Sequence, residues 1–177
     1  LKRGLNEGGD KLRTLVRRSL KQQVNLKSYG TVVSHTWTKG AGADLTYTIG
    51  ASGKGLPIDL FPTRYSSSPR AAIRWSPKDH WKLQPRNSQG QFGPLADDTS
   101  DGVTSNVWNV AHPFKRSFVH PRKGAVAIRP GSRSIRALYG ASLPKEITKD
   151  QSAATFETGV RSVVEPIIVK RLGRLMP

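Results

Sequence analysis

The 177-residue chain carries 29 Lys and Arg against 12 Asp and Glu, and its net charge of +17 favours an acidic protein, a nucleic acid or an anionic membrane as neighbour. The absence of cysteine excludes disulfides, thiol catalysis and cysteine-ligated metals, and no run of about 18 apolar residues could span a bilayer. The length suits one domain, and a hydrophobic content of 36% predicts that part of the chain orders against partners instead of packing on itself.

The first predicted element is a helix over residues 10–23, with one apolar stripe and basic residues on its other faces. Asp10 is the expected N-cap, because its side chain can accept hydrogen bonds from the first free amides. Gly8 and Gly9 weaken an extension of the helix toward the N-terminus, by up to ~1 kcal/mol each. The apolar stripe consists of Leu5, Leu12, Leu15, Val16 and Leu20.

A β-hairpin is predicted next. Apolar residues alternate with threonines over residues 44–50, which is the two-residue period of a half-buried strand. The β-rich segment 31–37 is expected to pair with it through a turn at 40–42. Residues 54–61 supply a third extended piece, in which Pro57 predicts an edge position or a bend.

Residues 62–104 are predicted to be a long loop or insertion within a single domain that spans residues 1–177. They are rich in Ser, Pro, Gly, Asn and Gln, and no hydrophobic period persists through them. Trp75 and Trp81 argue against pure disorder, because a segment with nothing to bury seldom carries tryptophan. We expect a loop that docks a partner.

A second hairpin and a long C-terminal helix complete the predicted fold. Segments 114–119 and 125–129 have strand character and flank the polar turn 121–124. Pro166 is expected to bend or restart the helix, since it removes a backbone donor and clashes with the preceding turn. The expected apolar face of that helix is Phe156, Val160, Val163, Val164, Ile167, Ile168, Leu172 and Leu175. The sequence therefore predicts an α+β fold: a small, mostly antiparallel β-sheet flanked by N-terminal and C-terminal helices, with one long loop insertion.

Residue types that carry catalysis are scattered along the chain. No histidine lies one helical turn from another on a helix; the four are His35, His80, His112 and His120. The acidic group Asp97, Asp98 and Asp101 falls in the expected insertion, which cannot hold a carboxylate pair at a fixed spacing. Residues 50–55 (GASGKG) lack the spacing of a phosphate-binding loop and are interpreted as a β-turn. We predict no enzymatic activity, no cofactor and no metal site.

The basic residues leave two kinds of partner open, DNA and an acidic protein. Phosphate contacts need no particular motif, whereas base-specific recognition needs a recognition helix or an aromatic platform, and neither pattern stands out here. The candidate contacts are Arg13, Arg17, Arg18, Lys21, Lys115 and Arg116. Sequence-independent nucleic-acid binding is therefore kept as the alternative function.

Four segments, in this order along the chain, resemble the minor tail protein Z family, the tail-completion proteins of tailed bacteriophages. The first two are the opening helix at residues 5–20 and an extended motif at 53–61 (GKGLPIDLF). The third is a basic and aromatic strand at 114–119 (FKRSFV). The fourth, which is the strongest, is residues 135–144 (IRALYGASLP), where Ala141 stands at a position that is often proline in the family. The predicted insertion has no counterpart.

This resemblance implies a structural virion protein that completes the head-proximal end of a phage tail and helps join the tail to the head. The implied partners are further copies of the chain, expected as a sixfold ring around the DNA channel, together with the tail terminator and the head–tail connector. Any contact with channel DNA is expected to be non-specific, and no membrane is involved. The implied location is the phage tail or neck, after assembly in the bacterial cytoplasm. Because the chain does not open on methionine, we expect the gene product to begin before Leu1.

Aromatic and apolar residues are the expected anchors for partner proteins, since buried tryptophans and tyrosines dominate many interfaces. The candidates are Trp75, Trp81, Trp108, Leu138 and Tyr139. The segment 135–144 is also expected to act as a strand-to-helix joint that fixes the C-terminal helix against the sheet.

Overall fold

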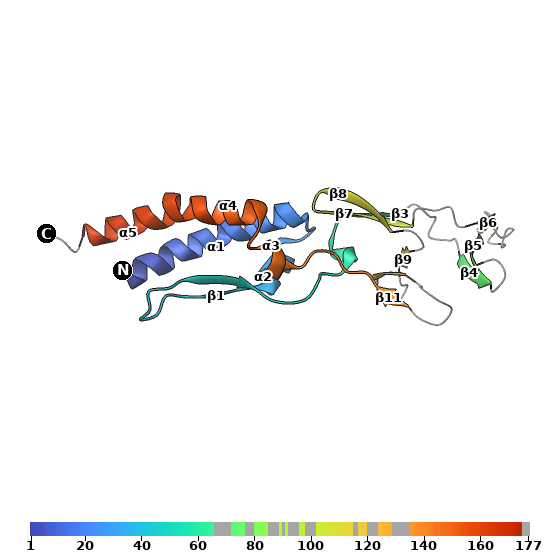
Figure 1. Cartoon of the computed structure of the whole chain (residues 1–177), viewed down its shortest axis with the longest axis horizontal. Coiled ribbons are helices and arrows are strands. Elements are labelled where there is room, and N and C mark those ends of the chain that lie inside the picture. Colours follow the sequence, from blue (N-terminus) through green and yellow to red (C-terminus); the bar gives the residue numbers. More distant parts are fainter. Residues whose placement is uncertain are drawn as a thin grey trace. The chain divides into compact units, whose positions relative to one another are not determined.

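The computed structural model describes residues 1–65, 72–76, 80–84, 89, 91, 96–97, 102–114, 117–119, 124–128 and 135–174. Contacts divide the chain into two compact units (Figure 1). Unit 1 comprises Leu1–Leu56 and Gly140–Pro177, and unit 2 comprises Pro57–Tyr139. The described chain consists of helices and small antiparallel sheets, which confirms the predicted α+β class.

Unit 1 combines a long N-terminal helix, a helical C-terminal segment and a two-stranded ribbon. Its helices are α1 (Lys2–Val24), α2 (Tyr29–His35), α3 (Leu143–Glu146), α4 (Asp150–Gly159), the π-helical turn η2 (Val160–Val164) and α5 (Glu165–Leu172). The ribbon pairs β1 (Thr36–Lys39) with β2 (Thr48–Ala51) in antiparallel fashion, with Trp37 opposite Gly50. The two predicted segments do pair, but only over these residues, and residues 40–47 form a longer connection than the predicted turn at 40–42.

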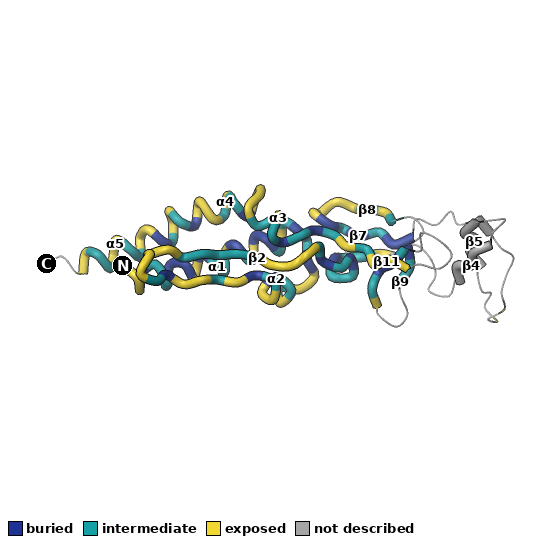
Figure 2. The backbone as a smooth tube through the Cα atoms, turned by 60° about the horizontal axis from the view of Figure 1, so that its bottom comes forward, coloured by how far each residue is buried: buried dark blue, intermediate teal, exposed yellow. Residues whose placement is uncertain are grey.

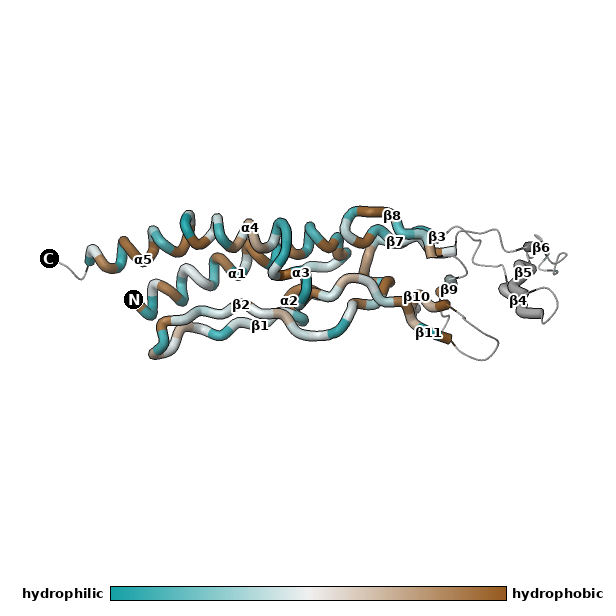
Figure 3. Tube along the Cα trace, in the orientation of Figure 1, coloured by the Kyte–Doolittle hydropathy of each residue, from teal (hydrophilic) through white to brown (hydrophobic). Residues whose placement is uncertain are grey.

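The helix α1 packs along α4, η2 and α5 through its apolar stripe (Figure 3). Leu12 and Val16 of α1 and Val164 of η2 form the buried centre of this core. Burying a Leu or Val side chain contributes roughly 1.5–3 kcal/mol. The predicted apolar face is thus correct at Val164, whereas Phe156 is 41% exposed. Partly buried apolar residues around the centre are Leu5, Ile49, Ile147, Val160 and Ile168.

The start predicted for α1 is wrong, because the helix begins at Lys2 and runs through Gly8 and Gly9. A Cβ on Gly9 would lie 2.6 Å from the Tyr47 ring, so glycine permits a close approach of the ribbon to the helix. Asp10 does not cap the helix; its carboxylate accepts a hydrogen bond from the Tyr47 hydroxyl at 2.8 Å. Tertiary packing has overridden the low helix propensity of the two glycines.

The strand predicted over 31–37 is wrong for most of its length, because Tyr29–His35 form α2. Ser28 caps this helix, since its hydroxyl oxygen accepts a hydrogen bond from the Gly30 amide at 3.1 Å. Val32 is fully buried on its inner face. The cap and the burial together favour a helical turn over the strand that the β-branched residues predict.

The extended piece predicted over 54–61 is confirmed at Leu56 and Pro57. Leu56 forms two backbone hydrogen bonds with residues 140–141, at 2.7 and 2.9 Å. After Pro57 the chain enters a single 3₁₀ turn, η1 (Ile58–Leu60), which is the bend expected at this proline.

The C-terminal helix restarts at Pro166, as predicted. Helix α4 ends at Gly159, the chain widens into η2, and α5 begins with Pro166 in its first turn. The proline directly follows the π-helical turn, where the ladder of backbone hydrogen bonds is already irregular, so its missing amide donor is tolerated. Leu175 lies outside the described residues.

In its described part, unit 2 contains three small antiparallel sheets where a single sheet was predicted. The first, in the order β3-β7-β8, contains β3 (Thr63–Tyr65), β7 (Val103–Val107) and β8 (Val110–Phe114). The second, in the order β11-β10-β9, contains β9 (Ser117–Val119), β10 (Val126–Ile128) and β11 (Arg136–Ala137). The third, in the order β4-β5-β6, contains β4 (Ala72–Ser76), β5 (His80–Gln84) and β6 (Ala96–Asp97). The buried apolar residues of the unit include Ile58, Phe61, Val103, Val107 and Val126.

The second predicted hairpin is confirmed as β9 paired with β10, with Phe118 opposite Ala127. Phe114 is the exception, because it ends β8 instead of starting β9. The range 62–104, expected as a long loop, contains the strands β3 to β6 and the start of β7. These strands are so short that their Ser- and Pro-rich flanks hide any period in the sequence.

Replacing Gly9 with alanine is expected to lower the free energy of unfolding by about 1–3 kcal/mol, because the added Cβ overlaps the Tyr47 ring. The matched control is Gly30→Ala in α2, where a Cβ would meet only the Ser28 hydroxyl at 3.4 Å. Alanine should leave stability unchanged or raise it there. Urea unfolding followed by circular dichroism measures both variants, and equal losses would contradict the packing assigned to Gly9.

Candidate interaction surfaces

Two of the basic residues predicted on α1 hold that helix to the ribbon. Arg17 donates one hydrogen bond to the Thr36 hydroxyl at 2.7 Å and a second to the Thr36 carbonyl at 3.1 Å. Arg13 forms an ion pair with Asp10 at 3.2 Å and donates to the Thr38 hydroxyl at 3.5 Å. Both guanidinium groups are therefore engaged within unit 1.

The remaining basic candidates are divided between exposed, half-buried and undescribed positions. Arg18 is exposed and Lys21 is half-buried, so Arg18 is the more open of the two to an anionic partner. Lys11, one turn before Leu15, pairs with Glu7 at 3.7 Å. Lys115 and Arg116 lie outside the described residues. On α1, the exposed residues Arg3, Lys11 and Arg18 lie on one helical face with Glu7, whereas Arg13 and Arg17 are engaged with the ribbon.

Tyr47 joins Asp10 and Arg13 in a polar network between α1 and the ribbon. Burial, followed by the hydrogen bond to Asp10, raises the pKa of the Tyr47 phenol above its ordinary value. The phenol therefore stays protonated and continues to donate to Asp10. The sequence offered no local signal for this contact, because the two residues lie on separate elements.

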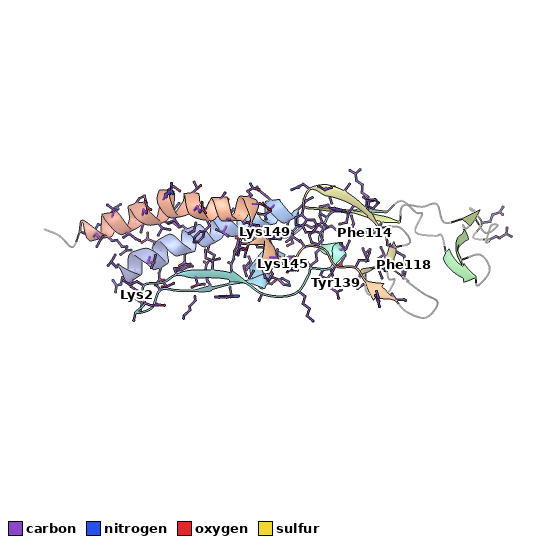
Figure 4. All side chains as sticks on the ribbon, viewed as in Figure 1. Lys2, Phe114, Phe118, Tyr139, Lys145 and Lys149 are labelled. Carbon is purple, nitrogen blue, oxygen red and sulfur yellow. The ribbon has the colours of Figure 1, made fainter. Side chains whose placement is uncertain are left out.

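Large apolar side chains are exposed in both units. Among the predicted anchors, Trp108 is 42% exposed and Tyr139 is 61% exposed beside β11 (Figure 4), while Leu138 is half-buried. Trp75 and Trp81 occupy opposite positions in the register of β4 and β5. Further exposed apolar residues, none of them predicted as anchors, are Trp37, Leu45, Val110 and Val169.

Trp108 stands at the tip of a tight β-hairpin. Only Trp108 and Asn109 separate β7 from β8, with φ angles of 54° and 59°. These left-handed values are typical of a type I′ hairpin turn, which usually holds Asn or Gly. A bulky residue there is a backbone outlier that costs on the order of 1–3 kcal/mol. The indole packs edge-on against His112, with ring centroids 5.9 Å apart and an interplanar angle of 80°.

A shallow groove runs between α1 and α4 in unit 1. Its volume is about 290 Å³, near the lower limit of small-molecule pockets. The groove therefore suits one or two side chains of a partner better than a cofactor. It is lined by Leu15, Gln151, Ala154, Thr155, Thr158, Gly159 and Ser162.

Ser105 lies opposite His112 in the β7–β8 register, which brings together two residue types that can form a catalytic pair. Within the described chain, the hydroxyl of Ser105 and Nε2 of His112 are buried without a hydrogen-bond partner. Ser105 is fully buried, so no substrate could reach its hydroxyl. The described residues contain no group of three His, Asp or Glu side chains that could hold a metal ion. In the same part of the chain, no helix is both long and apolar enough to cross a membrane.

Comparisons of the chain with protein-family models, curated proteins and solved structures gave no match.

Replacing Arg17 with alanine is expected to lower the free energy of unfolding by about 1–3 kcal/mol, since it leaves the Thr36 acceptors without their donor. The matched control Arg18→Ala removes an exposed charge and should change stability by less than about 0.5 kcal/mol. Urea unfolding of both variants gives the comparison. An Arg18→Ala loss as large as that of Arg17→Ala would contradict the roles assigned to them.

Stability is expected to depend on pH through Glu7. The hydrogen bond from Arg171, 2.6 Å long, holds the pKa of the Glu7 carboxyl below its ordinary value of 4.5. A carboxyl with a lowered folded-state pKa stabilises the fold above pH 4.5, and this contribution is lost as the pH falls through the folded-state pKa. The difference in melting temperature between the wild type and Glu7→Gln should therefore shrink below pH 4.5. Glu157→Gln, at an exposed site, is the control, and a difference for Glu7→Gln that is constant with pH would contradict the assignment.

Proposed function

We propose that this chain is a structural subunit that works in several copies, namely the protein that completes the head-proximal end of a phage tail and helps join the tail to the head. The observation that carries the proposal is the exposure of large apolar side chains, including Trp108, Val110 and Tyr139. Exposed aromatic and aliphatic residues of this size mark surfaces that become buried in an assembly. The order of the four family-like motifs along the chain supports the same role.

The internal use of basic residues supports a protein assembly over DNA binding by α1. Arg13 and Arg17 hold the ribbon, and Arg171 pairs with Glu7 across to α5. Arg13 and Arg17, two of the seven basic residues of α1, are thereby less available to phosphates. The net charge of +17 instead provides long-range attraction toward acidic neighbouring proteins.

In the proposed role, the chain assembles as a ring, expected to be sixfold, around the DNA channel of the tail. Its protein neighbours are the tail terminator and the head–tail connector. The location is the tail or neck of the virion, after assembly in the bacterial cytoplasm.

One observation favours the alternative, sequence-independent nucleic-acid binding. The Trp37 indole lies against Gly50 of the opposite strand, where a Cβ could not fit, and the side chain is half-exposed. Lys39, two residues along β1, shares this outer face of the ribbon and is exposed. An aromatic ring beside a cation can stack on a base and contact a phosphate.

The salt dependence of binding should distinguish the two functions, because added salt weakens binding to DNA but does not weaken self-assembly. Self-assembly of a chain with a charge of +17 is opposed by repulsion, so it should strengthen or hold steady as salt rises to about 0.15 M. Binding to DNA should weaken steeply over the same range, because each phosphate contact releases counterions.

The measurements are light scattering with electron microscopy for assembly, and fluorescence anisotropy with a labelled duplex and a labelled single strand for nucleic acid. The proposed function predicts closed oligomers at about 0.15 M salt and weak DNA binding. A monomer at every salt concentration that binds DNA tightly with a steep salt slope would establish the alternative instead.

A further inference from the structure

Like charge restricts where two copies of this chain can approach one another. With a net charge of +17, contacts between basic surfaces are opposed by repulsion. Residues 102–114 are the longest stretch of the sequence without Lys, Arg, Asp or Glu, and they contain the whole β7–β8 hairpin. The lining of the α1–α4 groove also lacks charged residues, and the exposed Lys11 and Arg18 lie one helical turn to either side of its Leu15. These are two surfaces at which copies can meet without bringing like charges together.

The tip of the hairpin is a convex apolar surface. Val110 pairs with the buried Val107, yet Val110 itself is 56% exposed, and β8 is coloured as exposed over most of its length (Figure 2). Trp108, in its left-handed conformation, adds a half-exposed indole next to it. The tip therefore exposes two large apolar side chains that an interface would bury.

The outer edge of β8 is blocked against the addition of another strand. The Asn106 amide donates to the Pro62 carbonyl at 2.9 Å, so the backbone of Asn106 faces β3. Ala111 lies opposite Asn106 in the register, so its backbone groups point away from β7, toward the outer edge of β8. Because the direction alternates along an antiparallel strand, the backbone groups of Pro113 point to the same edge. Pro113 has no amide hydrogen to donate, so a new strand cannot continue the ladder. A partner must therefore contact the side chains of the tip.

The α1–α4 groove is an open groove whose lining, like the tip, contains no charged residue. Leu15, which was predicted as part of the buried stripe of α1, is 37% exposed on its wall. Ala154, Thr158 and Ser162 line the groove at successive turns, and their small side chains leave it open. A hydrophobic side chain entering it would contact the leucine and the methyl groups of the lining.

We propose that the Trp108 and Val110 tip of one copy docks in the α1–α4 groove of a second copy. Charge supports the match, since the tip carries no Lys or Arg that the basic residues beside the groove would repel. Because the two surfaces differ, the contact is heterologous and repeats from copy to copy. The proposal rests on the multi-copy function above and adds the surfaces through which the copies join.

The absence of cysteine allows single introduced thiols to report this contact. Val110→Cys marks the tip, Ala154→Cys marks the groove, and Ser52→Cys marks an exposed control position. The variants are mixed in pairs, oxidised with diamide and analysed on non-reducing gels, and light scattering confirms that each still assembles like the wild type. A disulfide forms only when two Cα atoms come within about 7 Å. The V110C and A154C chains should therefore cross-link to each other, while neither should cross-link to itself or to S52C.

Substitutions test the same contact without cross-linking. Trp108→Gly removes the indole and relaxes the left-handed turn, so the fold should be retained while the dissociation constant of the assembly rises at least about tenfold. Thr158→Lys adds a charge to the groove at an exposed position and should have an effect of similar size. Trp37→Thr, at the matched exposed tryptophan of the ribbon, should leave the assembly unchanged.

The outcomes separate this contact from the proposed function. A wild type that assembles while V110C and A154C stay unlinked overturns the tip-to-groove contact and leaves the structural role standing. Cross-linking of V110C to itself also overturns it, in favour of a tip-to-tip contact. A wild type that is monomeric at every concentration overturns the structural role and this contact together.

Discussion

Close packing of α1 against the elements on both sides is the constraint on which unit 1 depends. Glycine makes it possible at two points, because Gly9 accepts the Tyr47 ring and Gly159 accepts the Leu12 side chain, and a Cβ fits at neither. With these elements in contact, Leu12, Val16 and Val164 exclude water from one shared core. A larger residue at either glycine would separate α1 from its neighbour and expose part of that core. The α1–α4 groove follows from the same packing, since Gly159 is part of its lining.

The distribution of charge follows from this packing as well. Several cations are used to hold elements together: Arg17 binds Thr36 on the ribbon, and Arg171 binds Glu7 between α5 and α1. With 29 basic and 12 acidic residues, most of the excess charge has no acidic partner in the chain and must face solvent or other molecules. The β7–β8 hairpin and the lining of the groove contain no Lys, Arg, Asp or Glu. They combine low repulsion with exposed apolar groups, which is the combination that self-association needs.

The parts of the fold that were predictable are those whose signal is local. The 3.6-residue period of α1 and of the C-terminal helix could be found because one apolar stripe on each faces one core, and Pro166 marks its own restart. The second hairpin was predictable from its strand character and polar turn, whereas only the ends of the two segments predicted for the first hairpin form strands. The start of α1 was not, because it depends on Tyr47, which lies far along the chain from Gly9.

For the candidate interaction surfaces, the sequence could predict which residue types take part but not which of them are exposed or already paired. Arg13 and Arg17 have the same appearance in sequence as Arg18, and what separates them is the ribbon that lies beside two of the three. Trp108 could be named as an anchor, but its left-handed backbone is set by the two-residue turn between β7 and β8. The groove has no sequence signature at all, because its lining comes from two helices at opposite ends of the chain.

A heterologous contact has a consequence that a two-fold contact does not have. Each copy carries one tip and one groove, so an open chain of copies always leaves one of each uncovered at its ends. Closure into a ring buries every Trp108 and every groove, which gives the closed form more buried apolar surface per copy than any open form. Repulsion between chains of charge +17 opposes extra contacts between their basic surfaces, and so favours an assembly held by a single small interface per pair. Repulsion between copies and the burial of exposed apolar side chains therefore both favour a closed ring in which neighbouring copies touch through one small interface.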